Sequence, residues 1–315
     1  MKRDFHKIIG ILILALILYK INISDVIELL LKTNLNYLVP VVFFTLPGFL
    51  IKSWRWRYLL KMQGIEYDLK SAFLAYLSSG YIGIITPGKV GEFVKVFYLK
   101  EDEKIDTGKA FSSVFADKFL DLGVLLLFGS IGIFYFPIGQ YAAFLIFIPL
   151  IFAFMLLITL TNEQMTAKLV YFITYWPFLK KYEMQIERQF KHFFDATAEF
   201  KSIKLLVPVI ASFIAYSIFF YQCHLMIISL GIHISSFNLI FCISIANLIS
   251  LIPISISGIG TRDATLIILF SYLGLSKEAA VSFSILFVFL LYLSLGVFGG
   301  IAWWLKPLKK WMDFK

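Results

Sequence analysis

The sequence predicts an all-α integral membrane protein with six full transmembrane helices and two re-entrant broken hairpins. Of its 315 residues, 60% are hydrophobic and only 16% are charged, whereas a soluble domain has about 45–50% apolar and about 25% charged residues. Several apolar runs also approach the roughly 20 residues that a helix needs to cross a bilayer. An ordinary soluble enzyme is excluded, because a soluble chain this apolar would expose large apolar patches to water.

Six apolar runs are predicted to cross the bilayer. The first follows Lys2 and Arg3 but has no small-residue cleavage site, so we interpret it as an uncleaved helix rather than a signal peptide. The second run contains Pro40 and Pro47. The six predicted spans are Ile8–Ile23, Tyr37–Ile51, Ala110–Phe136, Tyr141–Leu160, Leu205–Leu230 and Ala279–Leu305.

Two further apolar stretches, Ser71–Leu99 and Phe237–Leu273, are each interrupted by a Pro- and Gly-rich break. Each is interpreted as an apolar helix, a break and a second short helix. Non-helical backbone at membrane depth is tolerated only where it lines a cavity or is buried in protein, and paired breaks of this kind point to a transport site. The residues that break the helices are Pro87, Gly88 and Gly91 in the first stretch and Gly258 and Gly260 in the second.

The two broken stretches also predict an internal repeat. Aligning Gly91 with Gly260 gives an offset of 169 positions, and Thr107 and Ser276 then both stand where the N-cap of a long span is expected. If each break leaves the membrane on the side it entered, the halves are inverted, as in many transporters. We therefore predict one membrane domain over 1–315, with half-repeats 37–136 and 205–305 joined by a cytoplasmic linker helix in 162–204.

The distribution of basic residues predicts the orientation. Of 29 Lys and Arg, 24 lie in pieces 1–7, 52–109, 162–204 and 306–315, and four lie in the loops assigned to the other side. By the positive-inside rule, both termini are then cytoplasmic, in the cytoplasmic (inner) membrane of a bacterium or archaeon. The net charge of +9 is better explained by this rule and by an anionic membrane surface than by nucleic acid, so no nucleic-acid partner is expected.

Candidate functional residues are the charges that a bilayer would normally exclude, because each costs about 2.5–3.5 kcal/mol at the centre of a membrane helix. Asp117 and Asp121 are four residues apart and share a helix face. The alternative is an internal salt-bridge cluster with Lys89, Lys95 or Arg262. The predicted substrate-binding residues are Lys89, Glu92, Lys95, Asp117, Lys118, Asp121, Arg262 and Asp263.

The first break favours an anionic ligand, since Lys89 and Lys95 flank a helix that begins near Val90 and helix N-termini attract anions. A lipid phosphate is the natural anion in a membrane. The aromatic and basic segment 53–58 is interpreted as an interfacial anchor, in which Arg55 and Arg57 would contact head groups. Histidines and cysteines show no metal-ligand spacing, so no metal, cofactor or catalytic set is predicted.

Three motifs in this order resemble the transmembrane region of lysylphosphatidylglycerol synthases, a flippase-like membrane domain that also occurs as stand-alone inner-membrane proteins. They are Thr86–Glu92, Ala116–Asp121 and Gly258–Asp263, with Trp54–Trp56 upstream. In full-length synthases a soluble aminoacyltransferase domain follows, whereas this sequence ends at Lys315. The resemblance therefore implies lipid translocation without lysyl transfer. The implied substrates are aminoacylated or other anionic phospholipids, or isoprenoid-linked lipids.

The leading functional prediction is thus a flippase-type lipid transporter whose partners are membrane lipids. No nucleotide-binding pattern is present in the sequence, so a gradient, the membrane potential or mass action is expected to drive the movement. The first alternative is a membrane enzyme that modifies a lipid head group, with Glu92, Asp117 and Asp121 as acid–base groups or as ligands for a divalent metal such as Mg²⁺. The second is a non-transporting scaffold. A homo-oligomer stays an open alternative, and an enzymatic activity is less favoured than transport.

Overall fold

The computed structural model describes residues 19, 21–86, 88–136, 183–200, 202–252, 255 and 258–308. Within them all regular secondary structure is helical and there is no strand. The predicted span 141–160 lies outside the described residues, and so does nearly all of the predicted span 8–23. The prediction of an all-helical fold is confirmed.

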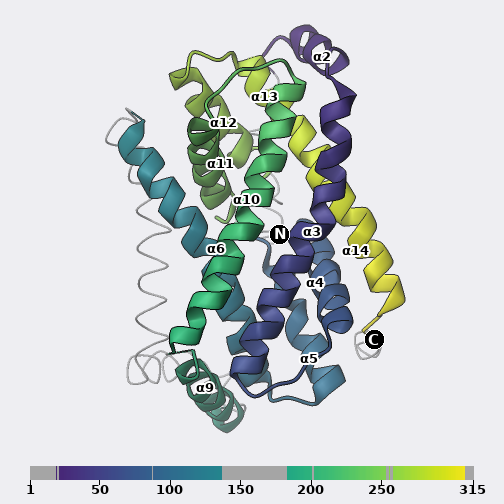
Figure 1. Ribbon diagram of the computed structural model, residues 1–315, viewed down its shortest axis with the longest axis vertical. Coiled ribbons are helices and arrows are strands. Elements are labelled where there is room, and N and C mark those ends of the chain that lie inside the picture. Colours follow the sequence, from purple (N-terminus) through teal and green to yellow (C-terminus); the bar gives the residue numbers. More distant parts are fainter. Residues whose placement is uncertain are drawn as a thin grey trace.

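Four long helical rods form the body of the molecule, and each is long and apolar enough to cross a membrane. They match four of the predicted spans. The first, α3, ends well beyond its predicted end at Ile51, so it carries Lys52 and Arg55 into the core. Figure 1 shows the rods running along the long axis of the molecule. They are α3 (Leu35–Met62), α6 (Thr107–Tyr135), α10 (Leu206–Ser229, after the 3-10 turn η3, Ile203–Leu205), and the continuous α13 (Lys277–Phe287), π-helical turn η4 (Val288–Tyr292) and α14 (Leu293–Leu305).

The two interrupted stretches form short helices on either side of each break. The first contains α4 (Leu69–Ile84), the 3-10 turn η1 (Val90–Val94) and α5 (Lys95–Glu103). The second contains α11 (Ser236–Ser250) and α12 (Thr261–Tyr272). In Figure 1 the first pair lies at the lower end of the molecule and the second at the upper end.

The two ends of the first interrupted stretch lie next to each other. The hydroxyl of Tyr67, just before α4, donates to the Asp102 carboxylate near the end of α5 at 2.5 Å. Its turn depends on left-handed backbone at Gly88 (φ 60°) and Lys89 (φ 57°), a conformation that costs a non-glycine residue energy. Gly91 allows close contact, since a Cβ there would lie 2.5 Å from the carbonyl oxygen of Ile82 in α4.

Side chains cap several helix N-termini. Asp68 caps α4 by accepting a hydrogen bond from the Ser71 N–H at 3.0 Å, which lowers the pKa of this carboxyl. Ser276 caps α13 as predicted, accepting from the Ala279 N–H at 3.1 Å. The prediction for Thr107 is wrong by one residue: Asp106 is the N-cap of α6, and its side chain makes no capping hydrogen bond.

Two amphipathic helices lie at opposite ends of the rods, α2 (Ile23–Leu31) at the top and α9 (Glu183–Ala198) at the bottom of Figure 1. The α9 helix falls within the predicted linker 162–204. It packs against the start of α6, where Gly108 donates its N–H to the Gln189 side chain at 2.7 Å. A Cβ at Gly108 would collide with the α9 backbone, so this glycine lets the two helices touch.

Along the described chain, a long helix, two short helices and another long helix follow one another twice, from α3 to α6 and from α10 to α14. Helices α3 and α10 pack antiparallel along their length: Asn34 N–H donates to the Ser229 carbonyl at 2.9 Å, and near the other end Arg55 donates to Ser212 at 2.8 Å. Around this pair, α11 packs on α6 and α4 packs on α14. Glycines mediate both contacts, Gly132 on α6 and Gly299 on α14, and small residues let membrane helices approach closely.

Candidate functional site

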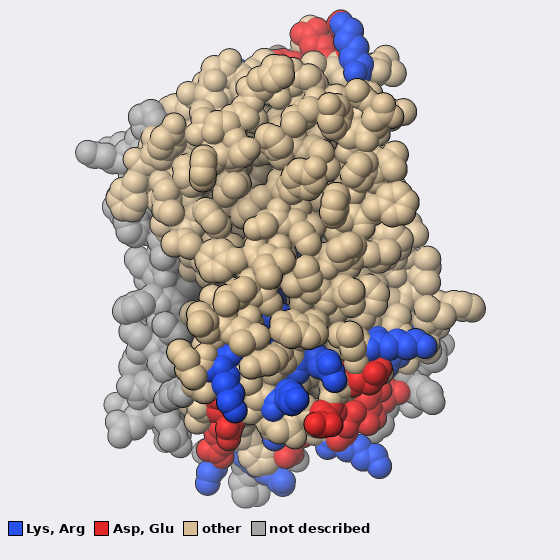
Figure 2. Space-filling view, viewed as in Figure 1, with Lys and Arg blue, Asp and Glu red and all other residues tan. Residues whose placement is uncertain are grey.

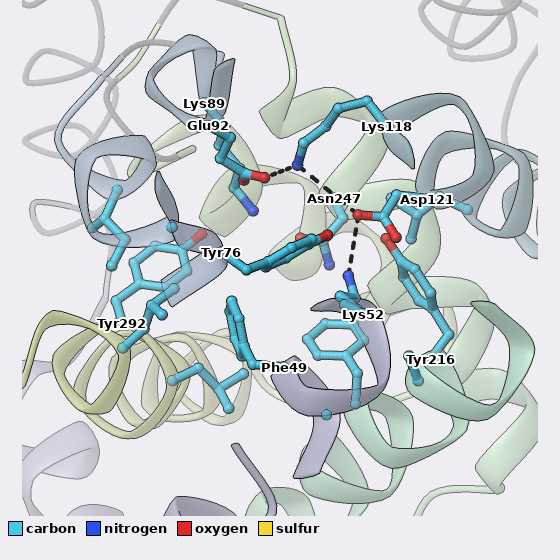
Figure 3. Close-up of a pocket in the computed structure, with 18 of the residues that line it drawn as sticks. Phe49, Lys52, Tyr76, Lys89, Glu92, Lys118, Asp121, Tyr216, Asn247 and Tyr292 are labelled. Carbon is cyan, nitrogen blue, oxygen red and sulfur yellow. Dashed lines mark hydrogen bonds and ion pairs between the residues drawn. The ribbon is translucent and has the colours of Figure 1, made fainter. Parts of the chain in front are cut away.

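A cavity of about 310 Å³ lies between the two helical halves. Its wall is apolar over most of its area but has a charged side (Figure 3). The charged side consists of Lys52, Lys89, Glu92, Lys118 and Asp121. The apolar lining includes Phe49, Leu122, Leu125, Ala215, Phe219, Leu291 and Leu295.

The charges on the cavity wall are linked by ion pairs, drawn as dashed lines in Figure 3. Lys118 on α6 pairs with Glu92 of η1 and lies 3.9 Å from Asp121. Lys52 on α3 donates to the other side of the Asp121 carboxylate, at 3.1 Å. These contacts tie the first break to two of the long helices, so the position of η1 depends on the charged wall.

A second set of charges lies behind the cavity wall and is completely buried. Arg55 donates to Asp117 Oδ1 at 2.9 Å through Nε and at 2.5 Å through Nη2, and to Asp121 at 2.9 Å through Nη1. Lys95 donates to Asp117 Oδ2 at 2.6 Å. Tyr76 donates to the same oxygen at 2.9 Å and separates this set from the cavity, whose wall it also lines.

Every carboxylate oxygen of Asp117 and Asp121 therefore accepts a hydrogen bond from a cation. A buried charge is tolerated only when it is paired and hydrogen-bonded. This arrangement supports the predicted alternative of an internal salt-bridge cluster for Asp117. The described residues include no group of three or more His, Cys, Asp or Glu side chains that could hold a metal ion.

Cations outnumber carboxylates in the cavity wall and the layer behind it. The five cations Lys52, Arg55, Lys89, Lys95 and Lys118 face the three carboxylates Glu92, Asp117 and Asp121. Among the residues described here, Lys89 forms no ion pair, and its ammonium lies 5.7 Å from the centre of the Tyr292 ring. The site as a whole therefore favours an anion.

A separate polar group surrounds the second break. Arg262, in the first turn of α12, donates through Nη2 to Asp263 at 2.9 Å and to Ser284 on α13 at 2.7 Å. Asp263 accepts the Gly260 N–H at 2.9 Å and so caps α12. Gly258 and Gly260 have the positive φ angles, 77° and 90°, that this turn needs.

The structure brings together only part of the predicted set. Lys89, Glu92, Lys118 and Asp121 line the cavity, whereas Lys95 and Asp117 lie behind it and Arg262 and Asp263 lie by the second break. Of the predicted break residues, Gly88, Gly91, Gly258 and Gly260 lie in or beside the turns, while Pro87 falls outside the described residues.

One predicted role is corrected. Arg55 does not contact head groups, because its side chain is 0% exposed and is held by Asp117 and Asp121. The segment 53–58 is helical, so its aromatic and basic residues point to different sides of α3: Trp56 is buried, while Trp54 and Arg57 are exposed. Arg57 donates to the Tyr67 carbonyl at 2.7 Å.

Sequence reasoning missed several residues of the cavity wall. Lys52 lies one residue past the predicted span that ends at Ile51, and the mixed aromatic and basic residues that follow it are the available signal for a longer helix. The aromatic and amide residues gave no signal, because they resemble ordinary residues of an apolar helix. The missed polar and aromatic lining includes Lys52, Tyr76, Tyr216, Gln222, Asn247 and Tyr292.

Long apolar helices around a cavity with buried charges define a multi-pass integral membrane protein. The chain belongs to the family described as the lysylphosphatidylglycerol synthase TM region, whose model matches residues 7–299. It is 28% identical to a UPF0104 membrane protein of Methanocaldococcus jannaschii, over 96% of this chain and 94% of the relative. A UPF0104 membrane protein of Pyrococcus horikoshii is 23% identical, over 91% of this chain and 92% of the relative.

Proposed function

We propose that this protein moves an anionic lipid between the two leaflets of the membrane. The observation that carries the proposal is the cavity itself, which combines a cation-rich wall with an apolar lining. A phospholipid has the same division, an anionic phosphate next to apolar chains. Paired helix breaks beside such a cavity are also typical of transporters. The family assignment supports a membrane-lipid context.

In this proposal the head group enters beside η1 and its phosphate replaces part of the ion pairing on the charged wall. Lys89 makes the first contact, because its ammonium is the one on the wall without a carboxylate partner among the described residues. Lys118 and Lys52 then also donate to the phosphate, which competes with Glu92 and Asp121 for the hydrogen bonds of these two ammonium groups. Glu92 and Asp121 would contact the amine of an aminoacylated head group.

The orientation we propose places the lower end of Figure 1 in the cytoplasm. Figure 2 shows Lys and Arg side chains gathered at that end, with a wide uncharged belt above them and few charges at the top. The belt corresponds to the hydrocarbon region, and the basic end follows the positive-inside rule. On this basis the protein lies in the cytoplasmic membrane of an archaeon or bacterium, with its cavity opening beside the cytoplasmic break.

Reconstitution into liposomes tests the proposal. Fluorescent phosphatidylglycerol in the inner leaflet should become accessible to an added quencher faster with the wild-type protein than in empty liposomes. Lys89→Gln should slow this movement severalfold. Lys100→Gln is the matched control, because Lys100 is exposed on α5 at the same end of the molecule and its loss removes the same charge. Equal rates with and without protein, across several anionic lipids, would contradict the proposal.

The same liposomes distinguish transport from lipid modification. A flippase changes the leaflet of a lipid and leaves its mass unchanged, whereas a head-group enzyme changes the mass. We therefore expect mass spectra of the extracted lipid to be identical before and after incubation. A new lipid mass that requires the protein would favour the enzymatic alternative instead.

A further inference from the structure

The second break holds a buried cation with unused hydrogen-bond donors. The Arg262 side chain is 0% exposed. Its Nη2 atom is occupied by Asp263 and Ser284, but Nε and Nη1 have no hydrogen-bond partner in the part of the chain that the structure describes. A buried donor without a partner is costly. A ligand that supplies oxygen acceptors at these two nitrogens would therefore be stabilised.

The neighbouring carboxylate is fixed on the other side of the guanidinium. Asp263 accepts hydrogen bonds from the Gly260 N–H and from the Ser284 hydroxyl in addition to Arg262. These contacts hold Asp263 on the Nη2 side. Nε and Nη1 of Arg262 are left as two separate donors on different sides of the guanidinium, and each can donate to a phosphate oxygen.

Aromatic rings separate these donors from the cavity. Phe287 and Tyr292 line the cavity, whereas Arg262 does not. The Arg262 Cζ atom lies 4.4 Å from the centre of the Phe287 ring and 5.6 Å from that of Tyr292. Lys89 lies 5.7 Å from the centre of the same Tyr292 ring, and Figure 3 shows Lys89 and Tyr292 on one side of the cavity. Tyr292 thus contacts a cation from each break.

The backbone that carries Tyr292 is also unusual. Tyr292 ends the π-helical turn η4, which interrupts an otherwise α-helical rod. In the other half, the corresponding helix α6 is α-helical throughout and has Gly123 169 positions before Tyr292, with open space around it. Short π-helical turns occur frequently at functional sites. Among the described residues, the Tyr292 ring and its π-helical turn therefore have no counterpart in α6.

We propose that Arg262 is a second contact for the phosphate of the lipid, reached from the Lys89 side of the cavity when the Tyr292 ring turns away. This inference rests on the proposed function for the identity of its ligand. Tyr292 is then a positioning residue that separates a contact near one break from a contact near the other. The lipid phosphate then passes from Lys89 to Arg262 and is next to a cation at each stage.

Thiol accessibility tests the wall between the two contacts. In protein whose Cys223 and Cys242 are replaced by Ala, Ser284→Cys places a thiol beside Arg262. We expect slow labelling by a small charged thiol reagent when Tyr292 is present, slow labelling with Tyr292→Phe, and severalfold faster labelling with Tyr292→Ala. Gel-filtration elution of each variant establishes that it is folded. Equal labelling rates in the three folded proteins would overturn the role of Tyr292.

Protection by lipid tests the phosphate contact. In the Tyr292→Ala protein, vesicles of phosphatidylglycerol should slow labelling of Ser284→Cys, whereas phosphatidylcholine vesicles should not. Inorganic phosphate in place of the anionic vesicles tests whether a free anion alone slows the labelling. Protection that persists unchanged in Arg262→Gln would overturn the contact. Labelling needs no lipid movement, so protein that is protected yet moves no lipid contradicts the proposed function alone and supports the Arg262 contact.

Discussion

At the scale of single residues, buried charges dominate this protein. The sequence identified Asp117 and Asp121 because carboxylates inside an apolar run are conspicuous. It could not identify Arg55 as their partner, because Arg55 is 62 positions from Asp117 and resembles an interfacial arginine. Pairing across such a separation depends on which helices touch, and the local pattern of residues does not contain that information.

The Asp117 carboxylate is predicted to be structural. Asp117→Asn keeps the shape but removes the counter-charge shared by Arg55 and Lys95, which are both fully buried. Breaking a buried ion pair costs about 3–5 kcal/mol, so the thermal midpoint in detergent should fall markedly. Glu28→Gln removes a carboxylate from an exposed pair with Lys32 and should leave the midpoint unchanged. Similar midpoints for the two variants would contradict this role.

Lys52 is predicted to act in the cavity rather than in the buried layer. Its ammonium contacts Asp121 and lies 4.6 Å from the centre of the Tyr216 ring, and both partners line the cavity. Lys52→Met should therefore slow movement of an anionic lipid severalfold while Arg55 still neutralises Asp121. Lys61→Met, a charge loss at an exposed position of the same helix, is the control. An equal effect of both variants on transport would contradict the prediction.

At the scale of elements, hydropathy predicted the four described long helices well, because each is a continuous apolar segment. It predicted the ends less well, since α3 continues to Met62 while the prediction stopped at Ile51. Charged residues usually end a span, but here Lys52 and Arg55 find partners on α6 and remain within the helix bundle. The tight turns followed from their glycines, whose positive φ angles are unfavourable for other residues.

The contact between α4 and η1 gives a prediction at this scale. Gly91→Ala would place a Cβ 2.5 Å from the Ile82 carbonyl oxygen, so η1 must move away and the link between Glu92 and Lys118 is strained. We expect a lower thermal midpoint and slower lipid movement. Gly123→Ala, in open space on α6, should be neutral or stabilising by up to about 1 kcal/mol. A Gly91→Ala protein as stable as Gly123→Ala would contradict this role of Gly91.

At the scale of the whole molecule, the arrangement of helices suggests why the charges are so unevenly distributed. The buried charges around Asp117 and Asp121 lie in the half that contains the first break, whereas the helix positions that correspond to them in the second half carry apolar and aromatic residues. Leu286 and Phe287 occupy the positions 169 residues after Asp117 and Lys118. The repeated helix order therefore supplies one framework, and the sequence of each half gives it a different chemistry. A pattern search finds the framework, whereas the division of roles needs the packed structure.

The predicted re-entrant layout concerns the topology of the whole chain. If α4 and α5 form a hairpin that returns to the cytoplasm, Glu66→Cys and Glu103→Cys should both resist an impermeant thiol reagent in intact cells and react after lysis. Lys32→Cys and Lys277→Cys should react in intact cells, because α2 and the start of α13 meet at the opposite end, where the Asn22 N–H donates to Glu278 at 3.3 Å. Cys223 and Cys242 are buried and give little background. Labelling of Glu103→Cys in intact cells, with Glu66→Cys protected, would show instead that the first interrupted stretch crosses the membrane.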